Sequence, residues 1–245
     1  MKTLNTLTLG IAIAAISFST TSCKKDKWPY CTKANGKMTT ETRTLDSFTK
    51  IEVEGEGDVF LHQITKETSH SIEIEASANI MDRIKTEVKN GKLIIGSDCI
   101  RGNEKMNFTV YVADLSAMSI SGSGSATTMT PFTVNDLDLE IEGSGDMDMD
   151  VTGRNMTCDI SGSGDIKMNG TATDFDIEID GSGDIHAFNL ISQDCFIDIS
   201  GSGNCEVYVD GELNVKISGS GDVLYDGTPT SFTTDISGSG DVSKR

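Results

Sequence analysis

The stretch "CDISGSGDIKMNG" spans Cys158–Gly170 and contains the pattern that decides the fold. Its centre is a Gly-Ser-Gly tripeptide, and this tripeptide occurs seven times in the second half of the chain. The intervals between successive copies are 21, 19, 19, 20, 18 and 19 residues. A sequence that repeats itself with a nearly constant period of this length is typical of a solenoid. The first glycines of the seven copies are Gly122, Gly143, Gly162, Gly181, Gly201, Gly219 and Gly238.

Apolar and polar residues alternate around every copy. An isoleucine stands two residues before the first glycine in all seven copies, and positions −6, −4 and +4 are mostly apolar. The residues between them are mostly polar, which is the period of a β-strand with one buried face. The alternation continues through the tripeptide, so both glycines are expected to point inward. We infer a bend there, at an inner corner that has no room for side chains.

A single unit of this kind cannot bury its own apolar face, but stacked units can. Each buried aliphatic side chain then contributes roughly 1.5–3 kcal/mol. The sequence therefore predicts an all-β fold, a parallel β-helix or β-solenoid with about 19–20 residues per coil. Parallel crossovers are almost always right-handed, so we expect a right-handed β-helix.

The pattern extends toward the N-terminus in imperfect form. Three copies can be aligned with Gly55, Ala76 and Gly96 at the position of the first glycine, and the last two put Ile74 and Ile94 at position −2. The alternative is a separate antiparallel piece, because Asn90-Gly91 between alternating strands is a strong hairpin signal. We predict a less regular β region over residues 45–118 and a regular solenoid over residues 119–245.

Three stretches carry a resemblance to a known family. They are "FTKIEVEGEGDVFLHQ" (Phe48–Gln63), "SIEIEASANIMDRIKTEVKNGKLIIGS" (Ser71–Ser97) and "VYVADLSAMSISGSGS" (Val110–Ser125). With the later Gly-Ser-Gly-Asp units, they resemble the auto-transporter adhesin, head GIN domain family. The resemblance implies a β-helical, secreted or lipid-anchored bacterial protein with a role in adhesion. It supplies no catalytic or binding residue to transfer to this chain.

The first residues have the features of a targeting signal. An apolar stretch, Leu7–Phe18, follows a short basic start and is followed by small residues that end at Cys23. This order is typical of a bacterial lipoprotein signal. We predict a signal peptide over residues 1–22, lipidation at Cys23, and a membrane-proximal tether over residues 23–44. The expected location is the outer membrane, with the lipid bilayer as a partner through the anchor.

The charge balance limits the partners. The formal net charge is −18 at pH 7, which disfavours binding to nucleic acids. We predict a non-enzymatic envelope protein, an adhesin that presents an acidic β-helical surface to a glycan or protein ligand. Two alternatives stay open at this stage, a glycan-acting β-helix enzyme and a periplasm-facing spacer without a ligand. The sequence also leaves open whether the protein faces the cell surface or the periplasm.

An aspartate column is the best candidate for chemistry in the repeat. We expect each carboxylate to accept hydrogen bonds from backbone N–H groups of its own turn. The alternative is calcium binding, although the turn lacks the number of oxygen ligands that calcium prefers. No metal site, cofactor or catalytic residue is predicted, because His62, His70 and His186 stand in no recognisable catalytic arrangement. The aspartates, three residues after the first glycine, are Asp58, Asp146, Asp165, Asp184, Asp222 and Asp241.

Six cysteines are present, and five remain if Cys23 carries lipid. Three of them occupy apolar positions of the repeat and are predicted to be small buried side chains. The other two, Cys31 and Cys99, could pair in an oxidising compartment, and the sequence leaves that question open. The three predicted to be buried are Cys158, Cys195 and Cys205.

Overall fold

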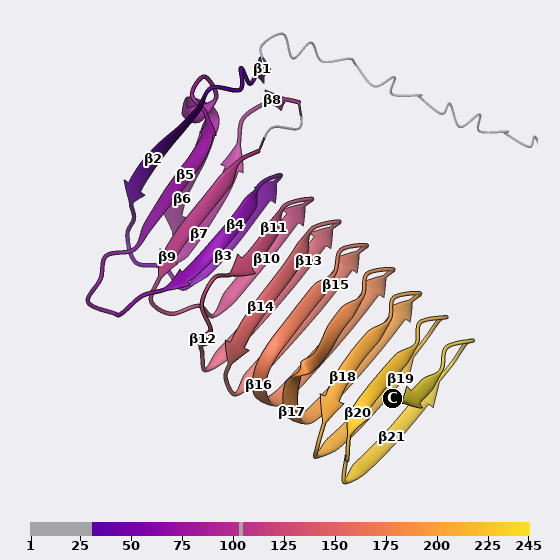
Figure 1. The fold of residues 1–245 in the computed structure, drawn as a ribbon. Helices are drawn as coiled ribbons and strands as arrows, with labels where there is room; N and C mark the ends of the chain where they lie inside the picture. Colours follow the sequence, from indigo (N-terminus) through magenta and orange to yellow (C-terminus); the bar gives the residue numbers. More distant parts are fainter. Residues whose placement is uncertain (1–30, 103–104) are drawn as a thin grey trace, which may run out of the picture. The chain divides into compact units, whose positions relative to one another are not determined.

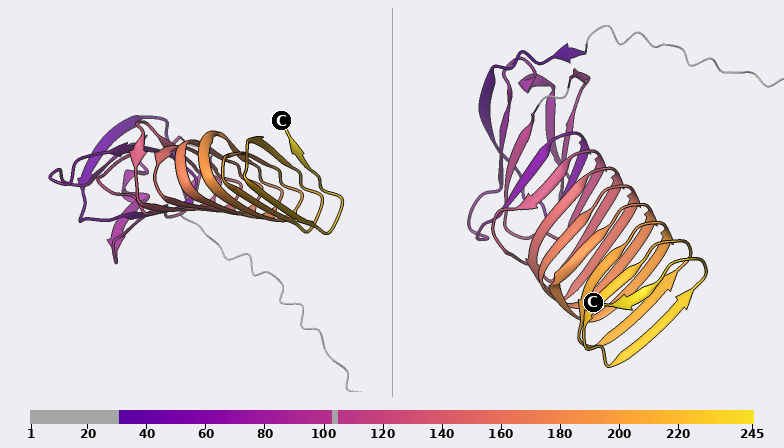
Figure 2. Two further views of the ribbon diagram at one scale, coloured as in Figure 1. Left: turned by 90° about the horizontal axis from the view of Figure 1, so that it is seen from below. Right: turned by 45° about the vertical axis from the view of Figure 1, so that its right-hand side comes forward.

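Each coil contributes one strand before the Gly-Ser-Gly turn and one strand after it, and the turns align along one edge of the stack (Figures 1 and 2). The computed structural model describes residues 31–102 and 105–245. We call the strands before the turns the pre-turn sheet. It contains β3 (Lys50–Gly55), β10 (Ala117–Gly122), β13 (Asp136–Gly143), β15 (Asn155–Gly162), the C-terminal halves of β16 (Ile166–Gly181) and β17 (Ile185–Gly201), β19 (Glu212–Ile217) and β21 (Ser231–Ile236).

The strands after the turns form the post-turn sheet. Neighbouring coils pair in parallel in both sheets, which confirms the predicted β-solenoid. The short strand β12 (Phe132–Thr133) pairs with β14 (Asp146–Thr152) near the return bend. The post-turn sheet contains β4 (Asp58–Gln63), β11 (Ser125–Thr128), β14 (Asp146–Thr152), the N-terminal halves of β16 and β17, β18 (Cys205–Val209), β20 (Val223–Gly227) and β22 (Val242–Lys244).

The core lies between the two sheets and is built from the predicted apolar columns. Ile120 pairs with Ile141, and the same position is occupied by an isoleucine in every later coil. These isoleucines are buried as far as Ile217, whereas Ile236 in the last coil is 40% exposed. Each side chain of this column packs on the next, which favours one residue type along the column; the first coil has Val53 at this position.

The region N-terminal to the regular coils contains antiparallel strands. β5 (Ser71–Ser77) pairs with β2 (Met38–Thr44) on one side and with β9 (Asn107–Val112) on the other. β6 (Ile84–Lys89) and β7 (Lys92–Ser97) form the hairpin that the sequence offered as an alternative, with positive φ at Asn90 and Gly91. The remaining elements are β1 (Thr32–Lys33), β8 (Ile100–Arg101) and the 3-10 turn η1 (Met81–Arg83).

Two of the three imperfect copies are not coils of the solenoid in the aligned register. Ile74 lies in β5, whose partners are antiparallel, and β7 pairs with β3 so that Ile95, not Ile94, stands opposite Val53. Alternation reports which face of a strand is buried, but not the direction of its partner. β3 and β4 pair directly with β10 and β11 of the Gly122 coil. Residues 64–116 are therefore an insertion between the first and second coils.

The glycines of the turns are required by the distance between coils. A Cβ atom on Gly145 would lie 2.6 Å from the carbonyl oxygen of Gly124 and 2.7 Å from Cγ2 of Ile120, both in the preceding coil. Gly143 also has φ of 131°, a value that disfavours other residues. The expectation that a tight inner corner excludes side chains was thus incomplete: the preceding coil occupies the space.

The cysteines divide as the sequence suggested. Cys31 and Cys99 form a disulfide that joins positions 68 residues apart, next to the β1–β8 pair. Cys158, Cys195 and Cys205 are buried, and burial raises the pKa of each thiol. Cys23 lies outside the described residues. The part of the chain that the structure describes holds no helix with the length and hydrophobicity of a membrane span.

Candidate binding surface

The outward side of the pre-turn sheet carries the densest set of charges on the regular coils. Outward positions of β13, β15 and the C-terminal halves of β16 and β17 hold many carboxylates and no Lys or Arg. We call this surface the acidic face. Its carboxylates belong to Asp136, Asp138, Glu140, Glu142, Asp159, Asp174, Asp176, Glu178, Asp180, Asp194 and Asp198.

A column of four carboxylates runs through the middle of the acidic face. Glu140, Asp159, Glu178 and Asp198 occupy directly paired positions in four successive coils. Adjacent strands lie about 4.8 Å apart, and like charges placed directly opposite each other are destabilising. Lys216 follows in the next coil and pairs with Asp198 at 2.6 Å. Within residues 31–102 and 105–245, the first three carboxylates have no such ion pair.

The raised pKa values of three of these acids reflect partial burial and the close spacing of like charges. Partial burial raises the pKa of Glu140 and of Asp159, and the charges of neighbouring acids raise both further. Burial is likewise the main cause of the raised pKa of Asp176, followed by the charge of Asp174. A cationic group bound against this column would relieve the repulsion. The acidic face is therefore suited to a basic partner.

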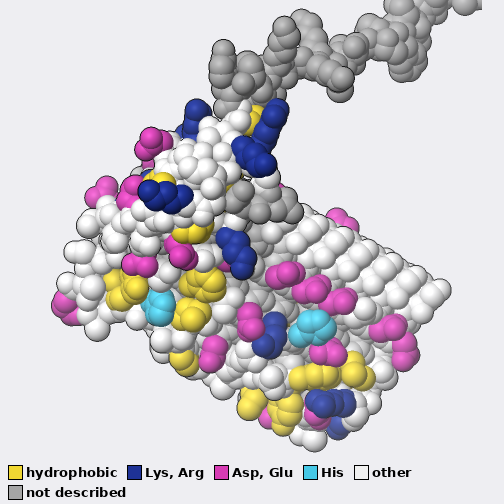
Figure 3. All heavy atoms as spheres, turned by 45° about the horizontal axis from the view of Figure 1, so that its top comes forward, with side chains coloured by type: hydrophobic (Ala, Val, Ile, Leu, Met, Phe, Trp, Pro, Cys, Tyr) yellow, Lys and Arg dark blue, Asp and Glu magenta, His cyan; other side chains and the backbone are white. Residues whose placement is uncertain are grey.

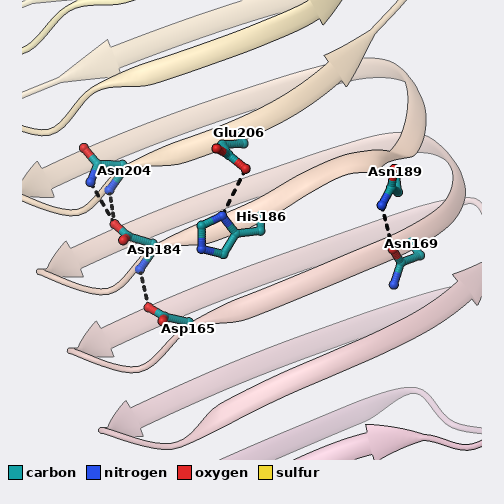
Figure 4. A network of polar contacts seen from close by, with 7 residues as sticks. All are labelled: Asp165, Asn169, Asp184, His186, Asn189, Asn204 and Glu206. Atoms are coloured by element: carbon teal, nitrogen blue, oxygen red, sulfur yellow. Dashed lines mark hydrogen bonds and ion pairs between the residues drawn. The ribbon is translucent and has the colours of Figure 1, made fainter.

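The predicted aspartate column lies at the beginning of the post-turn sheet and forms a ladder (Figure 4). The backbone N–H of Asp165 donates to the carboxylate of Asp146 at 3.2 Å. The N–H of Asp184 donates to Asp165 at 3.0 Å, as Figure 4 shows. The ladder continues through Asn204, Asp222 and Asp241. The expected partner, an N–H of the same turn, is wrong, because each acceptor reaches the next coil. The ladder holds adjacent turns together.

In the described part of the chain, the aspartate ladder contains no group of side chains arranged to coordinate a metal ion. Across residues 31–102 and 105–245, no cluster of three or more His, Cys, Asp or Glu side chains is arranged to hold a metal ion. One oxygen of Asp146, Asp165, Asp184 and Asp222 already accepts a backbone hydrogen bond. The geometry at these aspartates therefore explains them as structural residues.

The three histidines lie on different elements. His186 in β17 contacts the carboxylate of Glu206 at 3.0 Å on the open post-turn sheet, near the Asn169–Asn189 amide pair (Figure 4). His62 in β4 stacks on Tyr111, and His70 is buried against Phe48. The fold thus does not gather the imidazoles into one site. The pairing of β17 with β18 shifts register between Ala187 and Ile191, directly after His186.

The face of the molecule in Figure 3 carries side chains of several types. Acidic, basic and hydrophobic side chains are interspersed there, and histidine side chains lie among them. The acidic face differs from such a surface because its charges have one sign over four successive strands. A field of one sign over several coils attracts oppositely charged partners at longer range than mixed charges do.

Comparisons with known proteins agree with the geometry. A putative adhesin from Bacteroides fragilis NCTC 9343 has 25% sequence identity and a TM-score of 0.82, over 87% of this chain and 100% of that chain. A putative adhesin from Parabacteroides distasonis ATCC 8503 has 25% identity and a TM-score of 0.70, over 87% of this chain and 99% of that chain.

A further solved structure shares the fold. It is a putative lipid binding protein from Parabacteroides distasonis ATCC 8503, with 24% identity and a TM-score of 0.71, over 87% of this chain and 99% of that chain. No curated protein matches the sequence. The model of the family described as "Putative auto-transporter adhesin, head GIN domain" matches residues 47–229. The chain therefore belongs to the auto-transporter adhesin, head GIN domain family.

Proposed function

We propose that this protein is a non-enzymatic, lipid-anchored adhesin of the bacterial outer membrane, and that its acidic face binds a basic partner. The observation that carries the proposal is the carboxylate column of Glu140, Asp159 and Glu178, which is held in register by three paired strands. Its family membership supports a place in the cell envelope.

Rigid spacing makes the column a selective surface. Side chains that repeat about every 4.8 Å present a fixed charge pattern, because the backbone of each coil is bonded to both neighbours. A partner with Lys or Arg side chains on one strand or helix face can contact several carboxylates at once. Binding of such a partner would reduce the repulsion among the carboxylates and would therefore stabilise the folded protein.

The lipid anchor is proposed from the sequence. An apolar stretch that ends at Cys23 supports lipidation of that residue, and residues 23–44 would then lead from the bilayer to the solenoid. Residues 38–44 of this segment form β2 in the structure. The lipid would fix the N-terminal end of the chain to the bilayer.

The anchor is tested by the variant Cys23→Ser. We expect it to lose incorporation of labelled fatty acid and to move from the membrane fraction to the soluble fraction. Protease added to intact cells should degrade the wild-type solenoid while a periplasmic marker stays intact. Protection of the solenoid until the outer membrane is broken would contradict an adhesin and support a periplasm-facing spacer.

The acidic face is tested by a triple variant, Glu140→Gln, Asp159→Asn and Glu178→Gln. The probe is a ten-residue lysine peptide, measured by calorimetry at low and at physiological salt. We expect at least a tenfold weaker affinity and a shallower salt dependence, because three phased carboxylates are lost. Adhesion of cells that display the variant to cultured epithelial cells should fall in parallel.

A matched control removes the same charge elsewhere. Asp46→Asn, Glu73→Gln and Asp82→Asn change the net charge equally but lie in the N-terminal region, outside the acidic face. This control should keep the affinity of the wild type within about twofold. Equal losses in both triple variants would show that net charge alone attracts the peptide, and the proposed face would be wrong.

A further inference from the structure

The insertion of residues 64–116 creates a feature that the regular coils do not have. A cavity of about 270 Å³ opens where the segment before β3, the loop before β5, the β6–β7 turn and the segment after β9 meet. Loops held by a rigid scaffold are common places for binding sites. The cavity is lined by Ser47, Phe48, Thr49, Lys66, His70, Gly91, Ala113 and Asp114.

The wall of the cavity contains a buried imidazole with an unusual environment. His70 is only 9% exposed and packs edge-on against the ring of Phe48. Its Nδ1 lies 3.2 Å from the backbone nitrogen of Phe48, and its Nε2 lies 3.4 Å from the backbone nitrogen of Ala113. Both neighbours are N–H donors, so the ring is approached by a donor on each side.

A neutral imidazole cannot accept both hydrogen bonds. One ring nitrogen accepts, and the other carries a hydrogen and can only donate. At that second nitrogen the ring N–H and a backbone N–H face each other. None of the described residues places an acceptor atom against either of these two donors. An oxygen atom of a ligand in the cavity could accept from one of these two donors. The polar wall thus favours a ligand that brings an acceptor oxygen.

The rim of the cavity carries one charge of each sign. Lys66 and Asp114 form an ion pair at 2.9 Å, with side chains that are 75% and 51% exposed. Both residues, together with Thr49, also line a second cavity of about 480 Å³. The ion pair therefore lies at the boundary between the two cavities. Exposed pairs of this kind contribute little to stability, so their donors and acceptors can be redirected to a ligand.

We propose that these two cavities form a binding site for a neutral, hydroxyl-rich sugar ring of a glycan. The opposite charges on the rim favour a neutral ligand over an anion or a cation. Hydroxyl groups can both donate to Asp114 and accept from Lys66, from the Thr49 hydroxyl and from the donors beside His70. This site is independent of the acidic face and needs no basic partner.

The test is ligand-observed NMR on the full chain, with glucose, galactose, mannose and N-acetylglucosamine as separate probes. We expect at least one neutral sugar to receive saturation transfer and to bind with a measurable affinity. The variant Asp114→Asn should weaken that affinity at least tenfold, because the carboxylate accepts two sugar hydroxyls better than an amide does. Its melting temperature should equal that of the wild type, since the residue is half exposed.

The control is Asp98→Asn. Asp98 forms an exposed ion pair with Lys85 at 2.7 Å in the same region, and neither residue lines the cavity. This variant should bind the sugar as the wild type does. The proposal is overturned if none of the four sugars binds, if glucuronate binds and they do not, or if Asp114→Asn and Asp98→Asn bind equally well. Loss of peptide binding in the acidic-face variant would not change any of these results.

Discussion

The turn positions hold glycine because the preceding coil leaves no room for a side chain. A Cβ atom on Gly164 would clash with the backbone carbonyl of Gly145 in the preceding coil. We expect Gly164→Ala to destabilise the protein by about 1–3 kcal/mol, as overpacking commonly does. The measurement is urea unfolding followed by circular dichroism.

Ser163, the neighbour of Gly164, provides the control for that experiment. Its side chain is exposed, so Ser163→Ala should change the free energy of unfolding by less than about 0.5 kcal/mol. Similar effects of the two substitutions would contradict the explanation by close approach between coils. They would point instead to the turn conformation within one coil.

The acidic face predicts an unusual dependence of stability on pH. The folded protein raises the pKa of Asp159 above its ordinary value of 3.8, because of partial burial and the charges of Asp180 and Glu142. The folded state therefore binds a proton more tightly than the unfolded state does, and stability falls as pH rises through this interval. Asp159→Asn should stabilise the fold at pH 7 by roughly 0.2–1 kcal/mol.

The same substitution should have no stabilising effect at pH 3, where the carboxyl group is protonated in both states. Urea unfolding at the two pH values measures the difference. Asp82→Asn, which removes a charge outside the acidic face, should show no gain at pH 7. A gain for Asp159→Asn that persists at pH 3 would show that the amide packs better and that charge repulsion is not the cause.

At the scale of the element, one coil is an exchangeable unit. Removal of residues 163–181, which span one interval of 19 residues, would join Gly162 to Ser182 and keep every inward position in register. Since each coil contacts only its neighbours, we expect a cooperatively folded protein with reduced stability and a smaller denaturant m-value. Circular dichroism and chemical unfolding provide the measurement.

A deletion of about half a coil is the matched control. Removal of residues 163–171 would delete most of the post-turn strand of one coil. The pre-turn strand that follows would then lack the post-turn strand of its own coil, against which its apolar side chains pack. This variant should fail to fold cooperatively. If both deletions behaved alike, the stacked coil would not be the unit of stability.

The sequence predicts the coils well and the insertion poorly. The column from Ile120 to Ile217 could be found because the same residue type recurs at a fixed interval, and every copy packs on the next. β5 and β7 show the same alternation but pair with different neighbours, so alternation alone put Ile94 where Ile95 belongs. A local pattern reports burial, whereas strand direction depends on contacts between distant segments.

The candidate sites show the same limit. The acidic face follows from the odd positions of the repeat, which are visible in the sequence. The cavity near His70 depends on four segments that only the folded insertion brings together. Even for the aspartate ladder the sequence predicts the wrong partner, because the distance from the Asp165 carboxylate to the N–H of Asp184 is set by the stacking of coils.

At the scale of the whole molecule, one covalent link secures the N-terminal end. The Cys31–Cys99 disulfide closes a long loop, and a link of that kind typically contributes about 2–4 kcal/mol. The double variant Cys31→Ser and Cys99→Ser should lose about that much free energy of unfolding. Urea unfolding of both proteins without reductant measures it. An unchanged midpoint would show that the β1–β8 pair needs no covalent support.

The aspartate ladder has a direction. Each carboxylate accepts from the turn that comes next in the chain, so a finished coil already displays the acceptor for the coil that follows it. A polypeptide that crosses a membrane channel with its N-terminus first would meet a complete template at every step. Folding that starts at the N-terminal end can therefore proceed coil by coil, because each finished turn supplies the acceptor for the turn that follows it.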